Sequence, residues 1–137
     1  MIKVRELLGM TVYTPNKQKV LGHVCDISVW PDGSISGIVV ERGGFISRQS
    51  FIMRKDLLSI SKNGIIANPQ SGGQRNNIPQ HQLLGHNKII GSRINSGGRI
   101  SDLLVENDRI VSVEVSNGLL HDWRYGRSLI GWELFIR

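Results

Sequence analysis

Three residue types that serve in nucleophilic catalysis stand together early in the chain, at His23, Cys25 and Asp26. A catalytic cysteine needs a base within reach and an electropositive, accessible setting that favours the thiolate. On a β-strand, His23 and Cys25 would share one face, whereas Asp26 would point to the other. We therefore interpret Cys25 as a small core residue, and we predict no catalytic residues and no enzymatic activity.

The other histidines do not form a recognisable metal site. His81, His86 and His121 are scattered, and no closely spaced pair of ligands stands beside another. The single cysteine excludes a multi-cysteine zinc site and an intramolecular disulfide, and it fits a reducing compartment. The glycine pairs 43–44 and 97–98 do not open helices that carry phosphate-binding lysines. We therefore expect no metal ion and no cofactor.

Two segments combine arginines with aromatic residues, and we predict that they bind a partner. Their members are Arg42, Phe45 and Arg48 in the first segment, and Trp123, Arg124, Tyr125 and Arg127 in the second. This composition is typical of hot spots in protein–protein interfaces. It also suits RNA, whose bases stack on aromatic rings and whose phosphates pair with arginine. A purely structural alternative is that the aromatic side chains plug the ends of the fold.

The charge of the chain is consistent with an anionic partner. The net charge is +6; residues 1–68 carry nine Lys or Arg against five Asp or Glu, and the remainder carries eight against six. Such a field favours RNA, an acidic protein surface or an anionic membrane. A net charge of this size is also ordinary for a small soluble domain, so it does not choose among these partners.

The elements that must position these residues repeat along the chain. Leu8-Gly9 recurs as Leu84-Gly85, and the segment 22–27 recurs as the segment 98–103, both at a spacing of 76 residues. The next apolar residues recur at a spacing of 75: Ile35, Ile38 and Val40 match Ile110, Val113 and Val115. A repeat of this kind indicates two copies of one small module.

The repeat divides the chain into a first module at residues 1–68, a polar linker at 69–80 and a second module at 81–137. The second module is truncated at its C-terminal end, because nothing in it matches the apolar segment 65–67. A missing strand would leave an open sheet edge, which proteins seldom leave unguarded. We expect the other module, the N-terminal residues or a second chain to cover it; the last alternative would make a homo-oligomer.

The local signals are those of strands. We predict hairpins that pair 24–30 with 35–41, 57–60 with 65–67 and 100–105 with 110–116. Their turns contain Asp32-Gly33, Asn63-Gly64 and Asn107-Asp108, residue types that suit tight hairpins. Helix candidates are few and short, so the predicted fold is all-β.

The pattern Leu8-Gly9-x-x-Val12, followed by the segment 20–27 and a hairpin into the segment 37–40, resembles the PRC-barrel family. That family is named for the photosynthetic reaction centre H subunit and includes the C-terminal domain of the ribosome maturation factor RimM. The resemblance covers most of residues 4–67 and, more weakly, the second module. It implies two small, strongly bent antiparallel β-barrels in tandem, the second incomplete, that act as docking modules.

Six residues of the repeated motif are predicted to shape the fold: Gly9, Gly22, Asp26, Gly85, Gly98 and Asp102. The glycines would occupy turns or bulges where a β-carbon clashes. The two aspartates would accept hydrogen bonds from backbone N–H groups at a corner of the sheet.

These observations predict a non-enzymatic adaptor that docks onto another protein or assembly through loops of a tandem β-barrel. The alternative is an RNA-binding or ribosomal-particle factor of the RimM type, and attachment to a peripheral anionic membrane complex is a third hypothesis. The first residues contain no apolar leader segment, and no apolar run approaches the roughly 18–20 residues of a membrane-spanning helix. We therefore expect a cytoplasmic protein.

Overall fold

The computed structural model describes residues 2–43, 48–69, 89–94, 98–118, 126 and 128–132. These residues form mainly strands: β1 (Ile2–Lys3), β2 (Thr11–Tyr13), β3 (Val20–Val29), β4 (Ile35–Arg42), β5 (Arg48–Met53), β6 (Leu57–Ser61), β7 (Gly64–Ala67), β8 (Arg99–Glu106), β9 (Arg109–Ser116) and β10 (Ser128–Gly131). One short helix, α1 (Val4–Leu7), and two 3₁₀ turns, η1 (Pro15–Lys17) and η2 (Arg54–Asp56), accompany them. No helix in this part of the chain is long and apolar enough to cross a bilayer.

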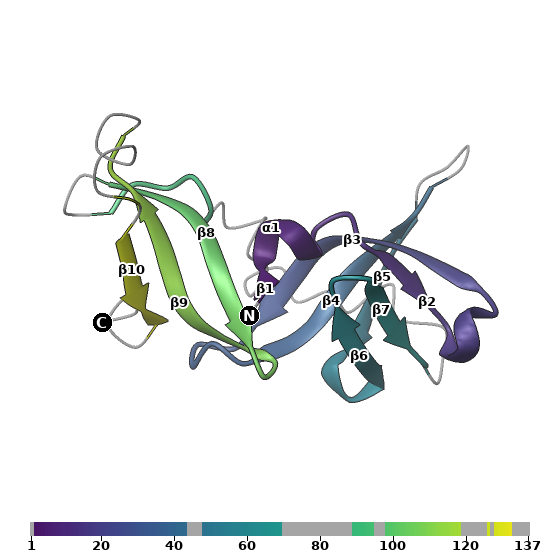
Figure 1. Ribbon diagram of the computed structural model, residues 1–137. Helices are drawn as coiled ribbons and strands as arrows, with labels where there is room; N and C mark the ends of the chain where they lie inside the picture. The colour runs from purple at the N-terminus through teal and green to yellow at the C-terminus, as the bar shows by residue number, and fades with distance from the viewer. Residues whose placement is uncertain are drawn as a thin grey trace.

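The strands form two sheets that lie one beyond the other in an elongated molecule (Figure 1). The larger sheet has the order β5-β4-β3-β2-β7-β6, and the smaller has the order β1-β8-β9-β10. All three predicted hairpins are present, as β3/β4, β6/β7 and β8/β9. The prediction of a mostly β fold is confirmed.

The sheets differ from the predicted antiparallel barrels in two ways. First, β2 and β7 pair in parallel. Second, no closed barrel is formed by the described residues. In the larger sheet the two edge strands, β5 and β6, are joined by the three residues of η2, so they come close at one end without forming a ladder. Four strands in the smaller sheet are too few to close around a core.

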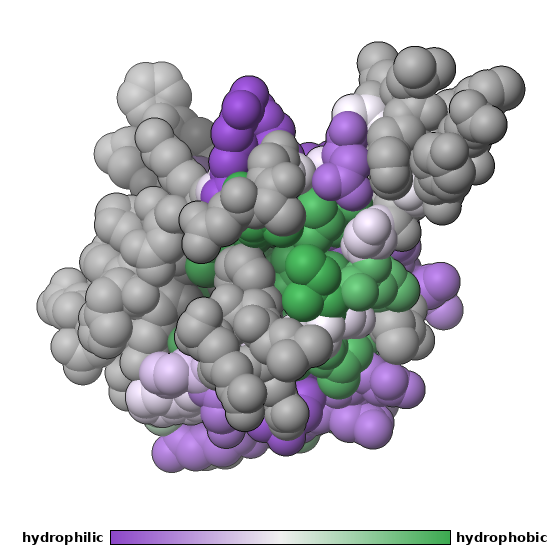
Figure 2. Space-filling model, turned by 90° about the vertical axis from the view of Figure 1, so that its left-hand side faces the viewer, coloured by the Kyte–Doolittle hydropathy of each residue, from purple (hydrophilic) through white to green (hydrophobic). Residues whose placement is uncertain are grey.

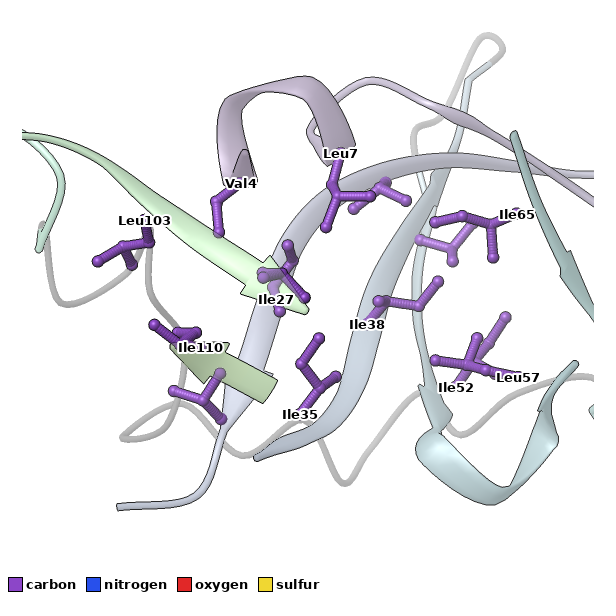
Figure 3. Packing of buried hydrophobic residues seen from close by; sticks show 14 of the residues in the cluster. Val4, Leu7, Ile27, Ile35, Ile38, Ile52, Leu57, Ile65, Leu103 and Ile110 are labelled. Atoms are coloured by element: carbon purple, nitrogen blue, oxygen red, sulfur yellow. The ribbon is translucent and has the colours of Figure 1, made fainter. Parts of the chain in front are cut away.

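One hydrophobic core runs through both sheets (Figure 3). Val4 and Leu7 of α1 are nearly inaccessible to solvent, and so are Ile27 of β3, Leu103 of β8 and Ile110 of β9. All belong to the same cluster. Because each sheet alone would bury only a small core, this shared packing ties the stability of one sheet to that of the other.

The N-terminal segment, which precedes the strands of the larger sheet, pairs with the smaller sheet. Ile2 and Lys3 of β1 pair with Val105 and Leu104 of β8, and α1 follows at once. The backbone N–H of Arg5 donates to Asp102 Oδ1 over 3.1 Å. The edge of β8 is therefore covered at this point by the N-terminal strand. The N-terminal residues were one of the three alternatives that the sequence analysis gave for covering an open edge.

The hairpins β3/β4 and β8/β9 have the same irregularities at matching positions. Cys25 is the extra residue of a bulge in β3, and Ser101 is the extra residue of a bulge in β8. A second bulge makes Ser36 the extra residue of β4 and Val111 the extra residue of β9. Since a bulge bends its strand and increases the local twist, the two hairpins bend at corresponding places.

The turns of these hairpins meet in the middle of the molecule. The N–H of Ile35 donates to Asp108 O over 2.9 Å, and the N–H of Ile110 donates to Gly33 O over 2.8 Å. Each bond is the other's counterpart at a spacing of 75 residues. Such reciprocity is what two like units form when they face each other across a local two-fold axis.

The side chains around this junction break that symmetry. Ser128 pairs with Val115 of β9 as Ser50 pairs with Val40 of β4, so β10 takes the place of β5 and Trp132 takes the place of Arg54. Arg54 forms an ion pair with Asp108. The Nε1–H of Trp132 instead donates to Pro31 O over 3.2 Å. A charged contact on one side of the junction therefore corresponds to an aromatic contact on the other.

Candidate functional site

The first predicted binding segment begins and ends on two paired strands. Arg42 closes β4 and Arg48 opens β5, and the two are directly opposite each other in the antiparallel ladder. Both are exposed. Phe45 lies outside the described residues, as do Trp123, Arg124, Tyr125 and Arg127 of the second predicted segment. The structure therefore brings together two of the seven residues and leaves the other five undescribed.

We call this end of the larger sheet the first tip; it comprises His23, Glu41, Arg42, Arg48 and Gln49. Like charges directly opposite in an antiparallel ladder repel and destabilise the sheet. None of the ion pairs between described residues includes either arginine of the tip. Both guanidinium groups are thus available to an anionic group of a partner, which would relieve their repulsion.

A second pair of opposed arginines, which the sequence analysis missed, lies at the far end of the smaller sheet. Arg93 and Arg99 form an isolated antiparallel bridge, and both are exposed. We call this end the second tip; it comprises Arg93, Arg99, Ser116 and Asn117. The signal that could have indicated it is the glycine pair 97–98 between two segments that each carry an arginine.

Gly22 and Gly98 occupy matching positions at the two tips. A β-carbon on Gly22 would lie 2.5 Å from the carbonyl oxygen of Glu41, and one on Gly98 would lie 2.6 Å from Val115 Cγ1. The absence of a side chain thus lets β4 and β9 pass close to β3 and to the start of β8. The ends of these strands carry the tips, so both glycines help to set their shape.

The remaining motif residues fix the backbone near the bends. Asp26 Oδ1 accepts the N–H of Ile27, and Asp102 Oδ1 accepts the N–H of Leu103, each over 2.8 Å. These bonds are of the kind predicted from the sequence.

Gly91 makes a bond that corresponds to that of Gly9. Gly9 N–H donates to Val24 O over 2.7 Å, and Gly91 N–H donates to Ile100 O over the same distance. The two glycines also share a positive φ, +89° and +94°. Gly85 lies outside the described residues.

Cys25 is half-buried on the face of the larger sheet that is opposite the main core, beside Val39 and Phe51. Burial, followed by the carboxylates of Glu41 and Asp26, raises the pKa of this thiol to about 11. The thiol is therefore protonated near neutral pH, the form that is a poor nucleophile. Among the described residues no group of histidine, cysteine and carboxylate side chains is arranged to hold a metal ion.

Hydrophobic side chains reach the surface at the β9/β10 end of the molecule, where Figure 2 shows them between hydrophilic ones. Leu129 of β10 is 61% exposed, more than any other large hydrophobic residue that the structure describes. β10 is an edge strand of its sheet. Nothing among the described contacts selects an occupant for this edge, in contrast to the charged tips.

Comparison with protein families gives an assignment for the half of the chain that holds the first tip. Residues 1–72 match the family model described as PRC-barrel domain. The chain belongs to the PRC-barrel family. This confirms the resemblance noted in the sequence for one domain. No curated protein matches the chain.

The PRC-barrel match includes Gly9, Gly22 and Asp26 together with the Arg42–Arg48 pair. Of the smaller sheet it includes only β1, and it ends before β8 and the Arg93–Arg99 pair. The first tip is thus part of the PRC-barrel domain itself, and the second tip belongs to the remainder of the chain.

Proposed function

We propose that this PRC-barrel protein is a non-enzymatic adaptor that docks onto another protein in the cytoplasm. The observation that carries the proposal is the directly opposed, exposed Arg42–Arg48 pair at the first tip. A sheet gains nothing from two facing guanidinium groups, whereas carboxylates on a client would form bidentate bonds with them.

We further propose that residues 81–137 form a second PRC-barrel-like repeat after the linker 69–80, so that the chain is a tandem of docking modules. Three observations support it: the matching bulges at Cys25 and Ser101, the matching bonds of Asp26 and Asp102, and the reciprocal bonds between the turns. Unrelated hairpins would have no reason to share all three.

The arrangement of the tips favours two separate contacts. The strand ends that carry the predicted loops, those of β4 and β9, point to opposite ends of the molecule (Figure 1). Between them lies the junction of the turns, where Arg54 is paired with Asp108 and Arg109 with Asp32. A nucleic-acid strand needs a continuous cationic groove. This neutralised middle therefore favours a protein client over RNA.

RNA or a ribosomal particle is the second candidate, because opposed arginines also suit phosphate groups. The two differ in their response to salt and nuclease. RNA binding weakens steeply as salt rises, with a slope that reports the number of phosphates neutralised. Docking onto a protein through a few arginines would survive moderate salt. An anionic membrane complex would be recovered with the membrane fraction, and a homo-oligomer would be seen as a larger mass in light scattering.

The test is affinity purification of the full chain from its native cell, with and without nuclease, followed by mass spectrometry. We expect a protein client that resists nuclease and is lost with the variant Arg42→Glu/Arg48→Glu. The control variant Lys19→Glu/Lys55→Glu has the same net charge and changes exposed residues away from the arginine pairs; it should retain the client. Recovery of the same client with both variants would refute the role of the first tip, and loss of all partners on nuclease treatment would favour RNA.

A further inference from the structure

We propose that the Arg93–Arg99 pair is a second carboxylate-binding anchor, so that the protein holds one acidic protein partner at both tips. The inference rests on the proposed docking function and extends it to residues outside the family match. It specifies the chemistry of the partner: two acidic segments, one for each arginine pair.

Backbone hydrogen bonds fix the second pair in place. Ile94 N–H donates to Gly98 O over 2.8 Å, and Ile100 N–H donates to Ser92 O over 2.9 Å. These bonds lie on either side of the bridge between Arg93 and Arg99. The two arginines are therefore held side by side by the fold, and a carboxylate can meet both without ordering the backbone first.

The fold itself does not require arginine at these positions. In the larger sheet the corresponding pair is Thr11 and His23, which are directly opposite on β2 and β3. Two neighbouring features support this correspondence. Gly22 of the larger sheet matches Gly98 of the smaller one, and the backbone bond of Gly9 matches that of Gly91. The same architecture thus forms with threonine and histidine at these positions. In the smaller sheet these positions instead carry two facing arginines, whose repulsion is a cost to the sheet.

No ion pair between described residues includes Arg93 or Arg99. A guanidinium group presents a planar fork of donors that matches a carboxylate in two parallel bonds. If the tips only needed to attract anions through a diffuse positive field, lysine would serve as well as arginine. Both tips use arginine, which points to bidentate recognition of carboxylates over general attraction.

Two anchors at opposite ends allow the protein to bind one partner bivalently. The distance between the tips follows from the lengths of the two hairpins. From the first tip to the junction of the turns the chain advances eight residues, from His23 to Pro31, and from the second tip it also advances eight, from Arg99 to Asn107. At about 3.3 Å per residue the tips are at most about 50 Å apart along the strands. A partner that reaches both binds the second anchor at a high effective concentration, which raises affinity by about 10²- to 10⁴-fold over one contact.

The experiment uses the full-length protein and two probes, a polyglutamate chain of about 60 residues and hexaglutamate. The long chain reaches about 200 Å when extended and the short one about 20 Å, so only the long chain can span both tips. Affinities are measured in about 0.15 M salt, where exposed charges more than about 8 Å apart are screened. The variants are Arg93→Ala/Arg99→Ala and Arg42→Ala/Arg48→Ala, with Lys19→Ala/Lys55→Ala as the control that loses the same charge.

We expect the long chain to bind the wild type about 100-fold or more tightly than hexaglutamate. Either arginine variant should reduce its affinity about 100-fold, while the lysine control changes it less than about twofold. If Arg93→Ala/Arg99→Ala binds the long chain as the wild type does, the second anchor is refuted. In that case a loss with Arg42→Ala/Arg48→Ala would leave the proposed docking function standing, whereas no loss with either would refute both.

Polyuridylate serves as the competing probe for a nucleic-acid partner. We expect polyglutamate to bind the wild type more tightly than polyuridylate of similar length. Tighter binding of polyuridylate, lost in the same arginine variants, would assign both tips to phosphate groups and overturn the acidic protein partner.

Discussion

At the scale of single residues, Gly22 combines a backbone conformation and a contact that other residues do not tolerate. Its φ of +143° is rare for L side chains, and a β-carbon there would lie 2.5 Å from the carbonyl oxygen of Glu41. Because Glu41 precedes Arg42, this close approach of β3 and β4 helps to position the first tip. The motif glycine therefore links the core geometry of the domain to its candidate binding residues.

The first prediction belongs to this residue. Gly22→Ala should lower the free energy of unfolding by about 2–4 kcal/mol, because it adds backbone strain to a clash with backbone atoms that cannot move aside. Gly43→Ala is the matched control: a β-carbon at Gly43 meets nothing within 4 Å, and the change should cost under about 0.5 kcal/mol. Urea denaturation measures both. Equal stability of the two variants would contradict the role assigned to Gly22.

At the scale of elements, β1 and α1 form a strap between the two sheets. β1 lies along the edge of β8, and α1 follows it with Val4 and Leu7 in the shared core. The N-cap of α1 has no side-chain hydrogen bond of its own. Asp102 of β8 takes part of that role, since its Oδ1 accepts the N–H of Arg5 within the first turn.

The second prediction concerns this strap. Asp102→Ala removes the acceptor for two N–H groups, those of Arg5 and Leu103, in a place where Asp102 is nearly inaccessible to water. We expect a loss of about 1–3 kcal/mol, with hydrogen exchange accelerated at both amides. Glu106→Ala, at the exposed end of β8, should leave both exchange rates unchanged. Slow exchange at Arg5 in the Asp102 variant would show that the strap is held by other contacts.

At the scale of the whole molecule, the shared core and the junction of the turns pack the two sheets together, so we expect them to unfold as one cooperative unit. Trp132 is one of the contacts between them. It follows β10 of the smaller sheet, is 6% exposed, and donates to Pro31 O of the β3–β4 turn. A β-carbon on Gly33 would lie 2.7 Å from its ring, so the tryptophan is closely packed on that turn.

The third prediction follows for unfolding. Trp132→Ala should lower the free energy of unfolding by about 3–5 kcal/mol, and the wild type should unfold in one transition that coincides by circular dichroism and fluorescence. Trp30→Ala is the control, because Trp30 is 50% exposed and its loss should cost much less. Two separate transitions in the wild type would mean that the sheets are independently stable.

The sequence alone determined the local structure and the family. Apolar runs and Asp-Gly, Asn-Gly and Asn-Asp turns predict the three hairpins, because strand pairing across a short turn depends on neighbouring residues. The short apolar, glycine and aspartate motif is sufficient for the PRC-barrel resemblance, and the combination of arginines with aromatic residues identifies Arg42 and Arg48. Their opposed positions were not predicted; they follow from the antiparallel pairing of β4 with β5.

Only the tertiary structure decided the contacts between distant segments. The pairing of β1 with β8, the parallel contact of β2 with β7 and the absence of barrel closure in the described residues depend on which edges meet in space. The bond of Gly91 to Ile100 and the Arg93–Arg99 bridge depend on register, which a linear spacing of 76 does not fix. The physical reason is that hydrogen bonds between strands select their partners by three-dimensional proximity and by burial of one face, and neither is recorded in a local pattern of residues.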